Sequence, residues 1–321
     1  METGKIIREI GLNVVIVLLA AGCSQSASEL PSQGHAIDFS PRITRSAVTS
    51  LGDGDSFAVW ARESIDGTSQ LILAQEEVHC SGNIWSYDNI RYWKSGATYD
   101  FYALYPHNTA NVTLQNSVEG ETPQITITGF DARNAVDLMT AEQTGFVYPG
   151  SSYSVVFDFR HLLSKVEIVG RIDPALEEAG VSARIISATL YGMAATGSNT
   201  IDAGGYGSWT FSETSTSGNP FSTCGTIALS STGVTLFGEM LPFPQTITQE
   251  FVLEIEYEYI DAHYTQNRFS KTFLLADAGL TQWEPAKGYR YTFTVGNDYI
   301  LFEKPEVIPW KSASGGIVTV E

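Results

Sequence analysis

The residue with the clearest chemical role is Cys23, and that role follows from what precedes it. An apolar run at residues 10–22 comes after Lys5 and Arg8 and covers only 13 residues, whereas a bilayer-spanning helix needs about 20. A basic start, a short apolar stretch and a small-residue end are typical of a secretory signal peptide. The ending AGC at 21–23 indicates a lipobox, in which Cys23 is acylated and becomes the mature N-terminal residue. The alternative is an ordinary signal peptide whose last residue is a cysteine.

The rest of the sequence has no local signature of catalysis or metal binding. No two of its five histidines lie within ten residues of each other: His35, His79, His107, His161 and His263. It also lacks the HExxH, CxxC, GxSxG, P-loop and GxGxxG patterns that many zinc, hydrolase and nucleotide sites use. We therefore predict a protein that is not an enzyme, with no catalytic residue, no metal ion and no cofactor. A carboxylate pair brought together only by folding is the alternative.

Cys80 and Cys224 are the two cysteines left once Cys23 is set aside. They could form one bridge in an oxidising compartment, or they could stay as two buried thiols. Their separation in the sequence does not show whether their Cα atoms approach within about 7 Å. Both alternatives stay open.

The composition favours a folded protein that does not bind nucleic acid. Apolar residues make up 43% and aromatic residues 12% of the 321 residues, which is enough to fill a core. The 36 acidic and 18 basic residues give a net charge of −18, and such a surface repels phosphate backbones. The simplest use of this charge is solubility outside the cell.

Short runs of Val, Ile, Thr, Phe and Tyr between Gly, Asn, Asp and Pro dominate the sequence from residue 37 onward, as in strands and turns. In EFVLEIEYEYI (250–260), glutamates at 254, 256 and 258 alternate with apolar residues. One face of this strand is therefore expected on a core and the other in water, with calcium binding as the alternative use of the acidic row. One short helix is expected at 173–180, with Asp173 as its N-cap, Pro174 in its first turn and Gly180 at its end.

These patterns predict an all-β protein of two antiparallel β-sandwich domains in tandem, with very little helix. The expected layout is a signal peptide at 1–22, a lipidated flexible tether at 23–35, an N-terminal sandwich at 36–172 and a C-terminal sandwich at 173–321. The tether is expected to be flexible because SQSASELPSQG has almost no apolar residues.

The stretch WSYDNIRYWKSGATYDFYALYP (85–106) is rich in aromatic residues. Exposed rings such as those of Trp85 or Trp93 could stack on sugars, which would make a glycan-binding surface. However, Tyr99 and Phe101 recur at alternate strand positions, and aromatic residues at that spacing usually fill a core or pair across strands. We favour the core.

Several of these stretches together resemble the fimbrillin family, the surface lipoproteins that form type V pili. They are YWKSGATYDFYALYP (92–106), DLMTA (137–141), FDFRHLLSKVEIVG (157–170) and YTFTVGNDYILFEKPEVIPW (291–310), with TRS at 44–46 near the start. Their order and spacing span nearly the whole chain. The resemblance implies two transthyretin-like or immunoglobulin-like sandwiches, exported as a surface-exposed lipoprotein of the outer membrane and built into a fimbria.

In that family an Arg-specific protease removes the first strand, and a strand from a neighbouring subunit takes its place. For this sequence the resemblance implies proteolytic processing after Arg45 or, as the second choice, after Arg42. The strand-like AIDF at 36–39 would then leave. A vacated sheet edge has unpaired backbone groups that a partner strand can satisfy. Repeating this step from head to tail makes a filament.

The terminal GGIVTVE (315–321) alternates like a strand. Its residues Ile317, Val318, Thr319 and Val320 are either a donor strand or the last strand of the second sandwich. A stalk subunit needs both a groove and a donor strand, a tip subunit needs only the groove, and an anchor needs no cleavage. All three roles stay open. The implied partners are other pilin subunits, the outer membrane and a host glycan or protein ligand. The alternative function is a lipid-anchored glycan-binding surface protein.

Overall fold

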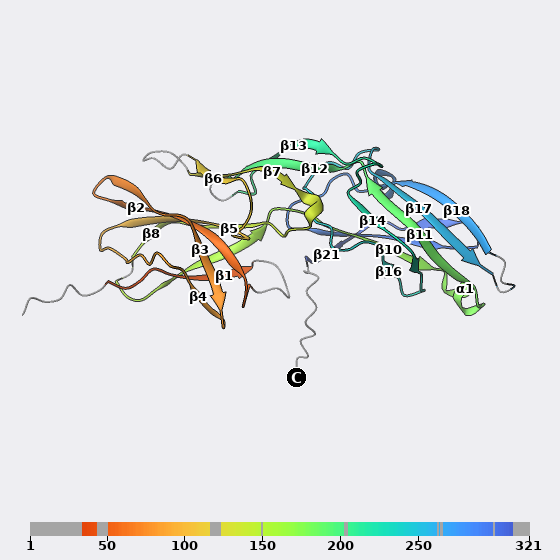
Figure 1. The fold of residues 1–321 in the computed structure, drawn as a ribbon, viewed down its shortest axis with the longest axis horizontal. Helices are drawn as coiled ribbons and strands as arrows, with labels where there is room; N and C mark the ends of the chain where they lie inside the picture. The colour runs from red at the N-terminus through yellow and green to blue at the C-terminus, as the bar shows by residue number, and fades with distance from the viewer. Residues whose placement is uncertain are drawn as a thin grey trace, which may run out of the picture. The chain divides into compact units, whose positions relative to one another are not determined.

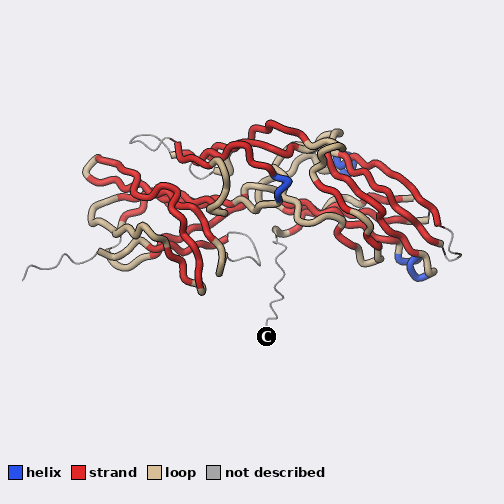
Figure 2. The backbone as a smooth tube through the Cα atoms, in the orientation of Figure 1, coloured by secondary structure: helices blue, strands red, loops and turns tan. Residues whose placement is uncertain are grey.

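Strands dominate the computed structural model, which describes residues 34–43, 51–115, 123–148, 150–201, 205–261, 263, 266–297 and 299–310. Figure 2 shows long strands with only short helical pieces between them. The all-β class expected from the sequence is therefore confirmed. The helical elements of the described residues are one α-helix and two 3-10 turns: α1 (Pro174–Glu178), η1 (Ala132–Asn134) and η2 (Leu275–Ala278).

The helix α1 forms where the sequence predicts it, because local capping is enough to specify so short an element. The side chain of Asp173 accepts a hydrogen bond from the backbone N–H of Ala175 at 2.9 Å, and Pro174 occupies the first turn. Gly180 follows the helix with a φ of 78°, a left-handed conformation that glycine adopts without strain.

The first sheet has seven strands in the order β1-β9-β8-β5-β2-β3-β4, with β1 and β4 at its two ends (Figure 1). Neighbouring strands run antiparallel, apart from β1 and β9, which are parallel. Its strands are β1 (Asp38–Ile43), β2 (Ser56–Ile65), β3 (Thr68–Ser81), β4 (Ile84–Ser86), β5 (Thr98–Tyr105), β8 (Met139–Val147) and β9 (Ser154–His161).

A second sheet has four antiparallel strands in the order β13-β12-β7-β6. The two middle strands, β7 and β12, come from segments far apart in the chain, with Ile125 opposite Ile201 and Asp131 opposite Thr196. The strands are β6 (Val112–Gln115), β7 (Gln124–Asp131), β12 (Ala194–Ile201) and β13 (Ser208–Thr214).

Two further sheets, each of five strands, contain most of the remaining chain. One has the order β16-β10-β19-β20, with β21 also paired to β19, and β10 runs parallel to β19. The other has the order β14-β11-β17-β18, with β15 also paired to β11. Their strands are β10 (Lys165–Ile172), β11 (Ser182–Tyr191), β14 (Ser222–Cys224), β15 (Ile227–Ala228), β16 (Val234–Thr235), β17 (Val252–Ile260), β18 (Gln266–Leu274), β19 (Gly288–Val295), β20 (Ile300–Phe302) and β21 (Glu306–Ile308).

Two hydrophobic cores lie on opposite faces of the seven-stranded sheet. On β2, Phe57 and Val59 belong to one core, whereas Ala58 and Trp60 belong to the other. Such alternation follows from the period of two in a strand. The first core, which is rich in aromatic residues, packs against one face of the seven-stranded sheet. The second core packs against the other face and continues through β7 and β12 into the two five-stranded sheets. Strand β2 is therefore buried on both faces.

The expected division into residues 36–172 and 173–321 stays a prediction. Strand pairing crosses it at three places, between β7 and β12, between β10 and β16 and between β10 and β19. The described residues all belong to one compact unit by their contacts. The two halves therefore share two sheets and a core.

Candidate functional site

Residues 34–43, which we name the closing segment, contain β1, one end strand of the seven-stranded sheet, and also contact the chain near β4 at the other end. Strand β1 pairs with β9 from Asp38 opposite Ser154 onward. Just before β1, the backbone N–H of Ile37 donates to the carbonyl oxygen of Arg91 at 2.8 Å. Residues 91–93 follow β4, and β1 itself also contacts β4 (Figure 1). The closing segment thus pairs with β9, which would otherwise have an open sheet edge, and also satisfies backbone groups of residues 91–93.

The side chains of the closing segment alternate between the core and the solvent. Ile37 is fully buried and Phe39 is 5% exposed, while Asp38 between them is exposed. The ring of Phe39 stacks on Phe157 with centroids 5.6 Å apart, and it meets Phe101 edge to face at 5.9 Å. Burying one such side chain stabilises a fold by about 1.5–3 kcal/mol. The segment is therefore held by apolar contacts as well as by its backbone.

Tyr87 anchors the start of the closing segment. Its hydroxyl donates to the carbonyl oxygen of Ile37 at 2.9 Å and accepts from the backbone N–H of Arg91 at 3.0 Å, while its ring lies 5.4 Å from that of Phe39. Burial raises the pKa of the Tyr87 phenol, and the negative charge of Asp38 adds to this effect. The phenol therefore stays protonated at physiological pH and can donate its hydrogen bond to the carbonyl oxygen of Ile37.

The buried carboxylate of Glu63 helps to position residues 91–94, part of which contacts the closing segment. Glu63 is 1% exposed and accepts hydrogen bonds from Lys94 at 2.6 Å, Gln70 at 2.8 Å and Tyr99 at 3.1 Å. Burial alone would raise the pKa of Glu63, but these three donors outweigh it and the pKa lies below its ordinary value. Burial, with the nearby Glu63 charge, raises the pKa of Tyr99 to about 12.

The residues predicted for processing and lipidation are placed only in part. Arg42 lies in β1 opposite Asp158, with an exposed side chain, and the AIDF stretch at 36–39 lies in the closing segment. The other predicted site residues fall outside the described residues: Cys23, Arg45, Ile317, Val318, Thr319 and Val320.

The last described part of the chain packs on the same strand that β1 pairs with. The rings of Trp310 and His161, at the end of β9, stack with centroids 4.2 Å apart. The Nδ1 atom of His161 lies 2.8 Å from a carboxylate oxygen of Asp137. Both aromatic side chains are buried. Strand β9 therefore contacts the beginning and the end of the described chain.

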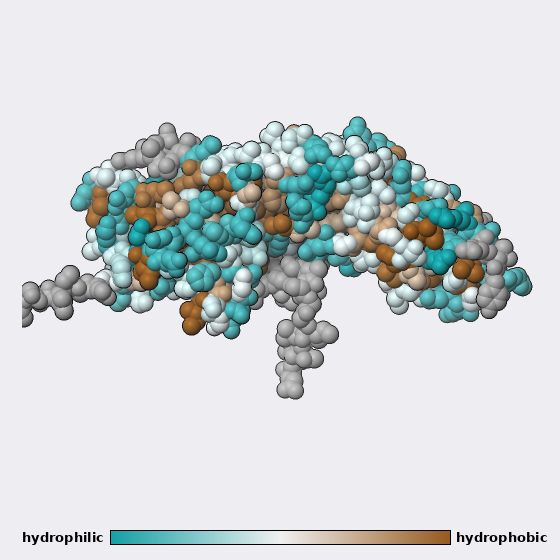
Figure 3. Space-filling view, viewed as in Figure 1, coloured by the Kyte–Doolittle hydropathy of each residue, from teal (hydrophilic) through white to brown (hydrophobic). Residues whose placement is uncertain are grey.

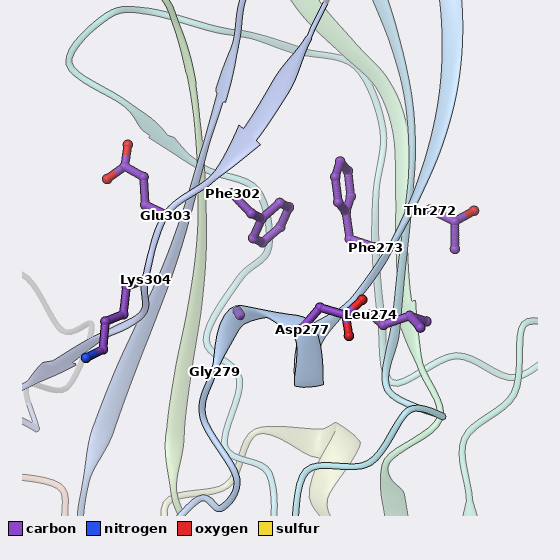
Figure 4. A pocket seen from close by; sticks show the side chains of 9 residues that line it. Thr272, Phe273, Leu274, Asp277, Gly279, Phe302, Glu303 and Lys304 are labelled. Carbon is purple, nitrogen blue, oxygen red and sulfur yellow. The ribbon is translucent and has the colours of Figure 1, made fainter.

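A groove of about 650 Å³ lies between the edge strands β18 and β20 (Figure 4). Phe273 and Phe302 point toward each other across it, with ring centroids 4.5 Å apart. Asp277, Glu303 and Lys304 give it charges of both signs. Strand β18 pairs along its whole length with β17 and ends its sheet, so its outer backbone edge is available for another strand.

The acidic row of β17 forms ion pairs with neighbouring strands. Arg184 donates to Glu258 at 2.6 Å, and Arg268 donates to Glu256 at 2.6 Å. The expectation that the whole row lies in water is wrong for Glu258, which is buried although its partner Arg184 is partly exposed. Within the described residues, no group of three or more His, Cys, Asp or Glu side chains is placed to hold a metal ion.

The two remaining cysteines are free thiols. Cys80 is buried and Cys224 is half-buried, and burial raises the pKa of the Cys224 thiol. Of the two alternatives left by the sequence, the structure therefore has unpaired thiols, which are poor nucleophiles when buried in apolar surroundings.

The aromatic stretch at 85–106 is mainly core, as predicted. Trp93, Tyr99 and Phe101 are buried, and Trp93 meets Tyr99 edge to face at 4.9 Å. These three rings therefore pack in the core against the seven-stranded sheet and are not exposed for stacking on a sugar.

Sequence reasoning missed how the closing segment is held at both sides. The sequence indicated only that AIDF at 36–39 is strand-like. Its partners lie more than fifty residues away, at Arg91 and in β9, and periodicity does not identify a strand's partner. No helix among the residues that the structure describes is long and apolar enough to cross a membrane.

Comparison with solved structures shows the same fold in three bacterial proteins. A fimbrial protein from Bacteroides vulgatus ATCC 8482 has a TM-score of 0.60 at 15% identity, covering 87% of this chain and 100% of its own. A candidate cell adhesion protein from Bacteroides ovatus ATCC 8483 has a TM-score of 0.55 at 16% identity, covering 88% and 99%. Another from Bacteroides uniformis ATCC 8492 has a TM-score of 0.51 at 16% identity, covering 88% and 100%.

No curated protein matches the sequence. The model of one protein family, described as fimbrillin-like, matches residues 44–310. The match covers well over half of the chain and includes strands of all four sheets. The chain therefore belongs to the fimbrillin-like family.

Proposed function

We propose that this protein is a non-enzymatic structural subunit of a fimbria that mediates adhesion at the cell surface. Its membership of the fimbrillin-like family supports this role, as does its fold, shared with a fimbrial protein and two candidate cell adhesion proteins. We further propose export by the signal peptide at 1–22 and attachment to the outer membrane through acylated Cys23. Other pilin subunits are its partners in assembly.

The observation that carries the assembly proposal is the double contact of the closing segment. Removal of residues 34–43 would expose the backbone edge of β9 and the backbone of residues 91–93. It would also empty the sites now filled by Ile37 and Phe39. A strand of a second subunit could satisfy both the hydrogen bonds and the apolar sites. A filament then grows by strand exchange, because each subunit repeats the same open step.

Cleavage after Arg45 fits this assembly better than cleavage after Arg42. The backbone of Arg42 belongs to β1, which is paired with β9, and a protease needs an extended chain that is free of such pairing. Cleavage at Arg42 therefore requires β1 to detach first. The donor in our proposal is the C-terminal stretch that contains Ile317, Val318, Thr319 and Val320.

The test is limited digestion of the full-length protein with an Arg-specific protease, followed by mass spectrometry of the new N-terminus and size analysis. We expect a stable body that begins at Ser46 and a ladder of oligomers. An Arg45→Ala variant should block both, while the matched Arg42→Ala variant should leave both unchanged. Deletion of residues 315–321 should preserve cleavage and abolish the ladder. The assembly proposal is refuted if the cleaved protein stays monomeric at every concentration.

A further inference from the structure

A second groove, lined in part by strand β13, has the chemistry of a ligand site. Its volume is about 340 Å³, at the lower end of the range for small-molecule pockets. Its lining includes three aromatic and three polar residues: Tyr206, Trp209, Phe211, Gln245, Thr246 and Gln282. It shares no residue with the closing segment or with the groove of Figure 4.

Two aromatic side chains of this groove pack on a buried aromatic ring beneath them. Trp209 and Phe211 are two residues apart on β13, so they lie on the same face of the strand. Both pack on the fully buried ring of Phe243, with centroids 4.5 and 5.4 Å apart. Phe211 nevertheless stays 42% exposed, and Tyr206 stays exposed as well. Such fixed rings with open surface lose little conformational entropy when a ligand binds.

The polar side of the groove contains amides and hydroxyls. Two hydrogen bonds hold the side chain of Gln245. Its Oε1 accepts from the backbone N–H of Ala194 at 3.0 Å, and its Nε2 donates to the carbonyl oxygen of Phe243 at 3.2 Å. The backbones of Thr246 and Gln282 form a β-bridge, and both side chains are exposed. These exposed groups can both donate and accept hydrogen bonds.

The groove is lined entirely by uncharged residues, although the chain has a net charge of −18. Figure 3 shows hydrophilic residues across much of the surface, with hydrophobic ones in separate patches. The guanidinium of Arg160 lies 6.0 Å from the centroid of the Tyr206 ring, but no charged side chain belongs to the lining itself. A charged ligand within the groove would therefore lose its hydration without a partner of opposite charge in the lining. A purely apolar ligand would leave the amides and hydroxyls unpaired.

We propose that this groove binds a neutral saccharide. The C–H face of a sugar ring is apolar and weakly positive, so it packs on the negative face of an aromatic ring. The sugar hydroxyls then reach the side chains of Thr246 and Gln282. This inference extends the adhesion part of the proposed function by assigning it a ligand class and a place. It does not require strand exchange, because all of the residues belong to one subunit.

The test is a glycan microarray of neutral, sialylated and sulfated glycans, probed with the uncleaved monomer. Calorimetry with the best neutral oligosaccharide then gives its affinity. We expect selective retention of neutral glycans. The Phe211→Ser and Gln282→Ala variants should each weaken binding by about tenfold, as expected for losing one aromatic or hydrogen-bond contact. Because the assay uses the monomer, a failure of assembly does not affect its outcome.

Phe269→Ser is the matched control, since Phe269 is also 42% exposed but lies on β18. This variant should bind like the unchanged protein. Circular dichroism of every variant separates loss of binding from loss of folding. The proposal is overturned if no glycan is retained, if only charged glycans are retained, or if Phe211→Ser and Gln282→Ala bind as tightly as the Phe269→Ser control.

Discussion

Truncating Phe39 to alanine tests whether side-chain packing holds the closing segment. Removing a buried Phe side chain costs about 3–5 kcal/mol in protein cores. Phe39 is nearly fully buried and contacts the rings of Phe157, Phe101 and Tyr87. However, β1 lies at the end of its sheet, where the chain can relax into part of the cavity. We therefore expect a loss near the lower limit, about 3 kcal/mol in the free energy of unfolding.

The measurement is urea unfolding with linear extrapolation, combined with amide hydrogen exchange of β9. The neighbouring Asp38→Ala variant is the control, because that side chain is exposed on the same strand, and its change should stay within about 0.5 kcal/mol. In Phe39→Ala, the amides of β9 should exchange faster than those of β17. Equal losses in the two variants, or a loss below about 1 kcal/mol for Phe39→Ala, would refute the packing argument.

Three further predictions concern stability and thiol chemistry. Glu63→Gln should cost about 1.5–3 kcal/mol at pH 7. The folded pKa of Glu63 lies below its ordinary value of 4.5. The stability difference between the unchanged protein and Glu63→Gln should therefore persist above pH 4.5 and shrink as the pH falls below it. A stability difference that stays constant from about pH 7 to 3 in urea titrations contradicts this prediction. Gly192→Ala should cost on the order of 3 kcal/mol, because φ is 97° and a Cβ would overlap the carbonyl of Glu250; a melting temperature unchanged by the substitution is the opposite result. Peptide mapping without reductant should detect no Cys80–Cys224 disulfide, and finding that linked peptide in freshly purified protein would disprove the free thiols.

The local elements could be predicted from the sequence because their causes are local. Asp173 and Pro174 specify the start of α1 through a cap and a fixed φ. The alternation in EFVLEIEYEYI gives β17 and its buried face. Tyr99 and Phe101, spaced as on a strand, were assigned correctly to a core.

The pairing of distant strands could not be predicted, because a period of two identifies faces and not neighbours. Nothing near Asp38 indicates that it lies beside Ser154, or that the two strands run parallel. Burial of Glu258 depends on Arg184 from β11, so the charge pattern of β17 alone was misleading. The groove beside β13 is assembled from several separate segments, and none of them has a motif by itself.

The direction of β1 has a consequence for the symmetry of any fibre. Because β1 runs parallel to β9, an incoming strand that reproduces its hydrogen bonds must enter with the same chain direction. If every joint brings the same donor segment to the same groove, all subunits point the same way along the axis and the two ends of the fibre are chemically different.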